Sequence, residues 1–230
     1  MNPVHPEEHL YSSDLITDIV IGMSDGLTVP FALAAGLSGV VDSTSIILTA
    51  GLAEIAAGSI AMGLGGYLAG RTEQEHYSSE LQRERREVEL VPEQEKQEVK
   101  DVFEELGLSA ETRDIIAEEM SRDKEKWVEF MMKYELGLEK PDPRRARKSA
   151  LNIGVSYIVG GIIPLAPYFF TDHPAEGLQW SAVITVCCLF VFGYFKARVT
   201  GQPAWQGAVR VTLIGSLAAT AAFLIAGLFK

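Results

Sequence analysis

Long apolar stretches separated by short polar segments dominate the pattern along the chain. Five of them approach or exceed the roughly 20 residues that an α-helix needs to cross a bilayer core about 30 Å thick; they cover residues 15–37, 44–70, 149–170, 178–195 and 204–229. A cleaved signal peptide is not expected, because the tail before the first stretch has no Lys or Arg and a second stretch follows closely. The pattern predicts an all-α integral membrane protein with five transmembrane helices.

The segment between the second and third predicted spans, residues 71–148, has a different composition. It carries 16 of the 20 Lys and Arg residues and 22 of the 31 Asp and Glu residues, yet apolar residues recur in it at helical spacing. We expect a three-helix insert: an extension of the second span to about residue 90, a helix over 92–106 and a helix over 109–137. The chain would then divide into residues 1–70, 71–148 and 149–230.

The net charge and the distribution of charged residues exclude some classes of protein and predict how the chain is oriented in the membrane. A net charge of −11 without a basic surplus argues against a nucleic-acid binder, and the only two cysteines are adjacent, which excludes a disulfide scaffold. Short cytoplasmic loops retain Lys and Arg. The insert is rich in both, and the loop after the fourth span has Lys196 and Arg198, whereas residues 40–43 and 171–177 have none. We therefore expect the N-terminus and the insert in the cytoplasm and the C-terminus on the other side.

Ionisable residues inside the predicted spans form the first candidate site. Asp18 and Asp25 lie on one face of the first span, since seven residues return to nearly the same side of a helix. A charged side chain at the centre of a membrane-spanning helix costs at least about 2.5 kcal/mol. Asp25 and Glu54 must therefore have a function or a structural partner that offsets this cost. Solvation at the interface is the alternative for Asp18, and an internal hydrogen bond is the alternative for the other two. Met62, beyond Glu54 on the same helix, is either a core filler or a thioether ligand.

Glutamates and methionines of the insert form the second candidate site. Two pairs of glutamates are spaced three residues apart, which places each pair on one helix face, and one glutamate follows a methionine after a single turn. Sulfur beside carboxylates suits Fe(II), Mn(II), Co(II) or Zn(II) better than Mg or Ca; a solvated acidic face is the alternative. The residues are Glu84, Glu87, Glu95, Glu98, Met131, Met132 and Glu135.

Two segments carry a resemblance to a known family. Residues 14–36 (DLITDIVIGMSDGLTVPFALAAG) and 51–77 (GLAEIAAGSIAMGLGGYLAGRTEQEHY), followed by an acidic insert and three more spans, resemble the vacuolar iron transporter family of plants, fungi and protists, and its plant members in particular. The resemblance extends over nearly the whole chain. Its most specific parts are DGLTVPF and AMGLGGYLA.

The resemblance implies a homodimer in the vacuolar membrane that exchanges cytosolic Fe(II) for vacuolar protons, with the insert as a cytoplasmic metal-binding domain and no prosthetic group. Zn(II), Co(II) and Mn(II) are expected as surrogate ions. Asp18 and Met132 match the family less closely than the other candidates. The positions that match imply Asp25, Glu54 and Met62 as transport-pathway residues and Glu84, Glu87, Glu95, Glu98, Met131 and Glu135 as insert ligands.

A transporter, not an enzyme, is therefore the leading hypothesis. The sequence has no GxxxxGK[ST] motif, so uphill transport would draw on an ion gradient. One alternative is a membrane-embedded di-metal carboxylate oxidase, but such a site needs two Glu-x-x-His motifs, which the sequence does not supply. The other alternative is a passive divalent-cation channel.

Overall fold

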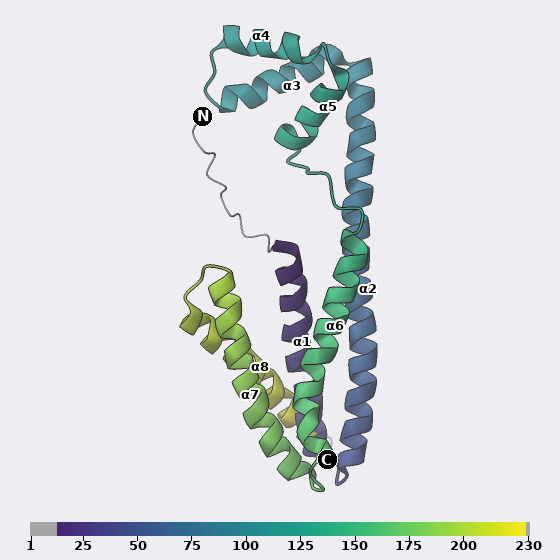
Figure 1. Cartoon of the computed structure of the whole chain (residues 1–230), viewed down its shortest axis with the longest axis vertical. Helices are drawn as coiled ribbons and strands as arrows, with labels where there is room; N and C mark the ends of the chain where they lie inside the picture. The colour runs from purple at the N-terminus through teal and green to yellow at the C-terminus, as the bar shows by residue number, and fades with distance from the viewer. Residues whose placement is uncertain (1–12, 229–230) are drawn as a thin grey trace, which may run out of the picture. The chain divides into compact units, whose positions relative to one another are not determined.

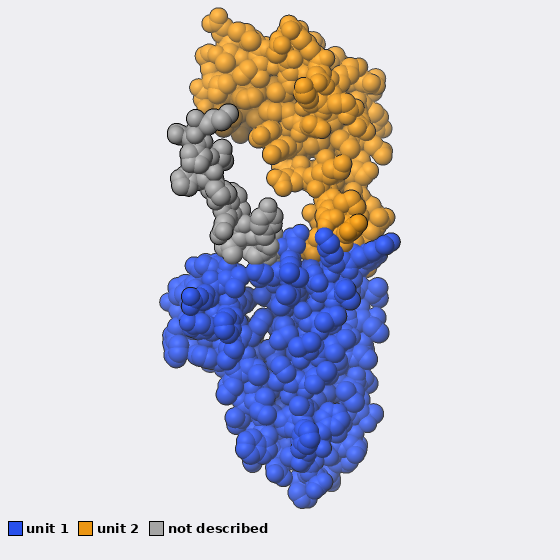
Figure 2. All heavy atoms as spheres, viewed as in Figure 1, with its two compact units in different colours: residues 1–67, 147–230 blue, residues 68–146 orange. Residues whose placement is uncertain are grey.

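The computed structural model describes residues 13–228, and these residues form helices without any strand (Figure 1). They divide into two compact units (Figure 2). Unit 1 comprises residues 1–67 and 147–230, and unit 2 comprises residues 68–146. The long helix α2 belongs to both units.

Five helices are long and apolar enough to cross a membrane, as the sequence predicts. Four of the predicted stretches match their helices to within about four residues at each end, whereas the second continues well past its apolar part. The helices are α1 (Ser13–Ser38), α2 (Thr44–Leu90), α6 (Arg145–Leu165), α7 (Pro174–Val199) and α8 (Ala204–Gly227). Helix α6 tightens at its end into the 3₁₀ turn η2 (Ala166–Phe169), beside two prolines that cannot donate a backbone hydrogen bond.

Small residues set the helix packing in unit 1. Gly22 and Gly26 of α1 lie directly against the backbone of α6 at Ile153 and Tyr157, so that a Cβ atom at either glycine would overlap it. Helix α7 packs against α8, and α1 packs against both. Apolar side chains gain little by leaving lipid for protein, so close backbone approach is what holds such helices together. The polar residues of α1 are thereby held against α6.

Unit 2 is built on the last turns of α2. It adds α3 (Pro92–Glu105), α4 (Ala110–Met120), α5 (Lys124–Phe130) and the π-helical turn η1 (Met131–Glu135). Its buried core includes Val88, Val99, Trp127, Met131 and Met132.

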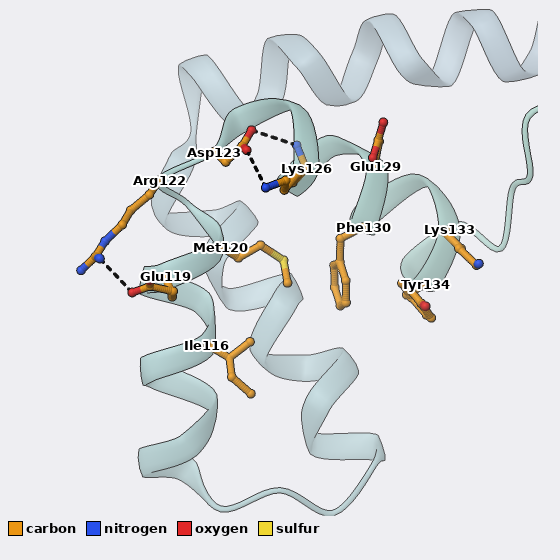
Figure 3. A pocket seen from close by; sticks show the side chains of 10 residues that line it. All are labelled: Ile116, Glu119, Met120, Arg122, Asp123, Lys126, Glu129, Phe130, Lys133 and Tyr134. Atoms are coloured by element: carbon orange, nitrogen blue, oxygen red, sulfur yellow. Dashed lines mark hydrogen bonds and ion pairs between the residues drawn. The ribbon is translucent and has the colours of Figure 1, made fainter. Parts of the chain in front are cut away.

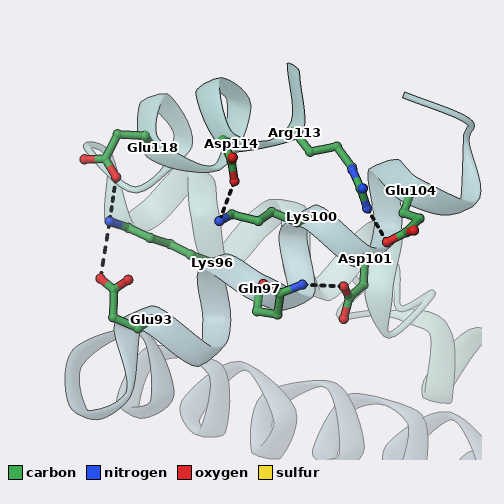
Figure 4. A network of polar contacts seen from close by, with 9 residues as sticks. All are labelled: Glu93, Lys96, Gln97, Lys100, Asp101, Glu104, Arg113, Asp114 and Glu118. Carbon is green, nitrogen blue, oxygen red and sulfur yellow. Dashed lines mark hydrogen bonds and ion pairs between the residues drawn. The ribbon is translucent and has the colours of Figure 1, made fainter. Parts of the chain in front are cut away.

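Charged side chains join α3 to α4 at the surface of unit 2 (Figure 4). Lys96 pairs with Glu118 at 2.7 Å, Lys100 pairs with Asp114 at 2.7 Å, and Arg113 pairs with Glu104. Exposed pairs of this kind contribute at most about 1 kcal/mol each, so the apolar core carries most of the stability of unit 2.

The prediction of one continuous helix over 109–137 is wrong. The chain breaks at residues 121–123, where the Ser121 hydroxyl donates to the Glu118 carbonyl (2.9 Å) and the Asp123 carboxylate accepts from the Lys126 amide (3.3 Å) to start α5. Short polar side chains that bond the local backbone compete with helix continuation. The apolar periodicity persists through the break, because α4 and α5 both face the same core.

Candidate functional site

The first candidate site lies where α1 meets α6 in unit 1. Asp18 is only 1% exposed, and its carboxylate accepts hydrogen bonds from Ser149 Oγ (2.9 Å) and Asn152 Nδ2 (3.3 Å). It is therefore a buried, hydrogen-bonded carboxylate and not a water-facing residue. Both donors are neutral side chains, and both lie on one face of α6.

Glu54 of α2 meets the same helix further along. The hydroxyl of Tyr157, which is 2% exposed, donates to Glu54 Oε1, and Gly58 lies against that hydroxyl and leaves room for it. Glu54 Oε2 is buried and accepts no hydrogen bond from any residue in the described range. One carboxylate oxygen is thus fixed by a phenol, while the other is buried without a hydrogen-bond partner in the described range.

Asp25 lies within electrostatic range of the Tyr157 hydroxyl, and it is half-buried beside Gly26. The structure therefore brings Asp25 and Glu54 to the same tyrosine from two different helices. Met62 is half-buried on α2, one turn beyond Gly58. We call Asp18, Asp25 and Glu54 the membrane carboxylates.

The second candidate site lies in the core of unit 2. Glu84 of α2 and Glu95 of α3 each precede a core valine by one helical turn, and both are buried, at 2% and 1% exposure. Each has one side-chain oxygen, Oε2, that is buried without a hydrogen-bond partner in the described range. A buried carboxylate that lacks partners is costly, so these oxygens need either a proton or a cation.

Burial raises the pKa of Glu84 to about 7 and that of Glu95 to about 8. Both side chains lie outside the membrane-spanning segments, since the apolar part of α2 ends near Gly70. The negative charges of Glu87, Glu98 and Glu135 contribute to both of these increases, and Arg83 partly offsets the effect at Glu84. The two buried carboxyl groups therefore lie in the electrostatic field of three further glutamates.

The remaining members of the group surround these two buried carboxylates. Glu87 is half-buried and pairs with Arg83 (3.2 Å), and Glu98 is half-buried and accepts from Gln94 Nε2 (3.3 Å). Glu135 is exposed at the end of η1; partial desolvation of its carboxylate and the charge of Glu98 raise its pKa. We call Glu84, Glu87, Glu95, Glu98 and Glu135, with Met131 and Met132, the insert cluster.

The π-helical turn η1 provides the two sulfurs. Met131 and Met132 are both buried in the same core as Val88 and Val99. The turn is closed by hydrogen bonds from the Leu136 amide to the Met131 carbonyl (3.0 Å) and from the Leu138 amide to the Met132 carbonyl (2.7 Å). Such turns are rare, and they occur often at functional sites.

Within residues 13–228, no three carboxylate, imidazole or thiolate side chains already converge as a metal site. The carboxylates of the insert cluster are therefore close enough for electrostatic interaction, but they do not converge on a single point that could hold a metal ion. A hollow of about 730 Å³ lies elsewhere in unit 2, between α4, α5 and η1 (Figure 3). Its lining balances three acidic with three basic residues and contains no member of the insert cluster, so it offers no special attraction for a cation.

Sequence reasoning missed the residues of α6 that serve the membrane carboxylates. Tyr157, Ser149 and Asn152 donate every hydrogen bond described above for Asp18 and Glu54. A signal was present, because Ser149, Asn152 and Ser156 recur at the spacing of one helix face inside an apolar span. A buried tyrosine also needs a partner for its hydroxyl.

Comparison with known proteins identifies the family. The model of the VIT family matches residues 16–227. The chain belongs to the VIT family. It is 47% identical to Vacuolar iron transporter 1 of Arabidopsis thaliana over 222 residues, which cover 96% of this chain and 89% of that protein. It is also 38% identical to Protein CCC1 of Saccharomyces cerevisiae over 218 residues, which cover 91% and 67% of the two chains.

The predicted resemblance to vacuolar iron transporters is thereby confirmed. A further relative in the VIT family, the Vacuolar iron transporter cccA of Arthroderma benhamiae, is 35% identical over 220 residues, which cover 92% of this chain and 78% of that protein. The plant and Arthroderma relatives are named as transporters, which agrees with the prediction that the chain is not an enzyme. The VIT match spans the membrane carboxylates, the insert cluster and Tyr157.

Proposed function

We propose that this chain moves Fe(II) from the cytosol into the vacuole in exchange for protons. The names of its relatives support iron as the transported ion and the vacuole as the destination. Exchange for protons is supported by one observation above all: Glu54 has a buried oxygen without a hydrogen-bond partner, and its other oxygen accepts from Tyr157, to which Asp25 is electrostatically coupled.

Proton exchange follows from the chemistry of these groups. A carboxylate binds a divalent ion only when it is ionised, so a proton that arrives from the acidic side releases the metal. The hydrogen bond from Tyr157 holds Glu54 in position to bind an ion, and Asp25 adds the second negative charge that a divalent ion needs. Met62 would add a soft ligand that favours Fe(II) over Mg(II).

The insert cluster would collect ions for the transport pathway. Carboxyl groups with pKa values near 7 and 8 hold their protons in the absence of metal, and they lose them when a divalent ion arrives. The sulfurs of Met131 and Met132 would favour first-row transition metals over Mg and Ca. This role requires the N-terminus and the insert to face the cytoplasm and the C-terminus to face the lumen, which is the orientation that the Lys and Arg distribution favours. We further propose a homodimer.

Uptake into proteoliposomes tests the exchange. Fe(II) should accumulate when the vesicle interior is acidic and should not accumulate without the gradient, and Zn(II), Co(II) and Mn(II) should compete. Equal flux with and without the gradient would favour the passive channel instead. Fe(II)-dependent oxygen consumption by the purified protein would favour the di-metal oxidase. Light scattering with detergent correction would test the dimer.

A further inference from the structure

A small cavity with two basic residues in its lining lies at the junction between α7 and α8, apart from both candidate sites. Its volume is about 130 Å³, and it is lined by the last turns of α7, the connecting segment and the first turns of α8. At about 30 Å³ per liquid water, it has room for roughly four waters or one phosphate-sized group. Its polar lining includes Lys196, Gln202, Gln206 and Arg210.

The backbone shapes this cavity before any ligand binds. Gly193 and Gly207 bring the two helices together, since a Cβ atom at Gly193 would lie 2.8 Å from the Gly207 carbonyl oxygen. Gly201 has a φ of 68°, in the left-handed region, and the Gln202 amide that follows donates to the Ala197 carbonyl (2.8 Å). This turn ends α7 and fixes the segment between the helices. The cavity is therefore a fixed feature of the helix junction.

The charge at this junction is unusual for this protein. The chain has a net charge of −11, yet no Asp or Glu follows Glu176 in the sequence. Neither Lys196 nor Arg210 forms an ion pair with another residue of the described chain. In the insert, by contrast, Lys96, Lys100 and Arg113 are all paired with acids (Figure 4). Two cations that line one cavity without an acidic partner attract an anion.

The surroundings of the cavity are those of a membrane interface. Trp205, one residue into α8, is 67% exposed, and its ring meets Phe190 edge-on with 5.3 Å between the ring centroids. Exposed tryptophans and basic residues at the ends of spans mark the depth of lipid headgroups. Basic pockets between transmembrane helices at this depth are suited to phosphorylated headgroups.

We propose that the α7–α8 cavity binds a phosphate group, with Lys196 and Arg210 as its charged ligands and the amides of Gln202 and Gln206 as hydrogen-bond donors. The phosphate belongs either to an acidic phospholipid of the bilayer or to a soluble phosphate compound. Both sources present the same chemistry to the cavity, and the experiment distinguishes them.

The test uses the full-length protein in nanodiscs of phosphatidylcholine, with or without phosphatidylinositol 4-phosphate, and in detergent with added inorganic phosphate. The acidic lipid should raise the melting temperature and remain bound in native mass spectrometry. Lys196→Gln and Arg210→Gln should each weaken this binding about fivefold and together about 25-fold, since each basic residue near an anionic surface contributes about 1 kcal/mol and 1.4 kcal/mol is a factor of ten.

Arg198→Gln is the matched control, because Arg198 is exposed in the same segment but does not line the cavity. It should retain lipid binding.

A response to phosphatidylinositol 4-phosphate alone assigns the phosphate to the lipid, and an equal response to inorganic phosphate assigns it to a soluble compound. Equal losses in the control and the cavity variants would overturn the proposal, because they would show general surface attraction. So would the absence of any response to either anion. Fe(II) uptake in phosphatidylcholine alone should be unchanged in folded cavity variants.

Discussion

The membrane carboxylates and the insert cluster bury negative charge in opposite ways. In unit 1, Asp18 and Glu54 receive hydrogen bonds from neutral donors on α6. In unit 2, Glu84 and Glu95 face further glutamates, and each leaves a buried oxygen without a hydrogen-bond partner in the described range, as Glu54 also does. Neutral donors favour the ionised form of a carboxyl group, whereas apolar surroundings and like charges favour the protonated form.

This difference assigns different tasks to the two regions. A carboxylate that accepts a hydrogen bond from Tyr157 is fixed in position to bind an ion and to release it when a proton arrives from the acidic side. The glutamates of the insert cluster hold protons near neutral pH, so their affinity for metal depends on the pH of the compartment that they face. We infer that pH should control metal binding most strongly in the insert, and that single substitutions should affect transport most strongly in the membrane.

The largest expected effect is the pH dependence of metal binding by the insert cluster. With pKa values of about 7 and about 8, two protons must leave Glu84 and Glu95 before both can bind Zn(II), so affinity should rise more than about 100-fold from pH 6 to pH 8. Isothermal titration calorimetry of the full-length protein at each pH measures this affinity for Zn(II). The double variant Glu84→Gln with Glu95→Gln should lose this dependence, while Glu105→Gln, an exposed residue outside the cluster, should keep it.

The metal-free protein should show the opposite trend in stability. An unfolded glutamate loses its proton near pH 4.5, whereas Glu84 and Glu95 keep theirs up to about pH 7 and about pH 8. Between these values the folded state binds more protons, so its stability falls as pH rises. We expect a lower melting temperature at pH 8.5 than at pH 6, with the loss reversed by Zn(II). A melting temperature that rises with pH would contradict the assignment of these two groups.

The next effect is that of Asp25→Asn on transport. Asparagine keeps the size and the hydrogen bonding of aspartate but cannot bind a divalent ion as an anion. Removing one member of a buried charge pair costs about 2–5 kcal/mol, so Fe(II) uptake should fall roughly 30-fold or more while the protein still folds. Zn(II) binding by the insert should persist. Near wild-type uptake would show that Asp25 is only a structural hydrogen-bonding residue.

Tyr157→Phe tests the neutral-donor side of the comparison. The variant removes one hydroxyl and leaves Glu54 without its donor. Hydrogen bonds inside membranes average about 0.6 kcal/mol, with a maximum near 1.7, so uptake should fall about three- to twentyfold. Tyr194→Phe, which removes a hydroxyl from α7, is the control. If both variants behaved alike, the bond to Glu54 would have no special role.

The sequence allowed more of the fold than of the sites to be predicted. Spans follow from the length of apolar stretches, and the continuation of α2 to Leu90 follows from periodicity that persists past the membrane. The break at residues 121–123 and the π-helical turn η1 were not predicted, because local side-chain bonds and a one-residue widening of a helix leave the periodicity intact.

The sequence indicated the candidate carboxylates because a charged residue is conspicuous in an apolar span. It did not indicate their hydrogen-bond partners. Tyr157 and Asn152 are ordinary residues for a membrane helix. Only the approach of α6 to α1 at Gly22 and Gly26, and to α2 at Gly58, shows that they face the carboxylates. A helix crossing depends on contacts between residues more than a hundred positions apart. A single sequence shows which residues need a partner, but not which residue provides it.

The smallest expected effect is that of Met62→Leu. Leucine has a similar volume, so the substitution should cost less than about 1.5 kcal/mol of stability. As a thioether ligand, Met62 would contribute selectivity more than affinity, and its loss should therefore weaken the preference for Fe(II) over Mg(II) in competition uptake more than it lowers the maximal rate. Met23→Leu on α1 is the matched control, since Met23 is also half-buried in a span. Unchanged selectivity in Met62→Leu would make Met62 a core filler, and the membrane site would then consist of oxygen ligands alone, with metal discrimination left to the sulfurs of the insert cluster.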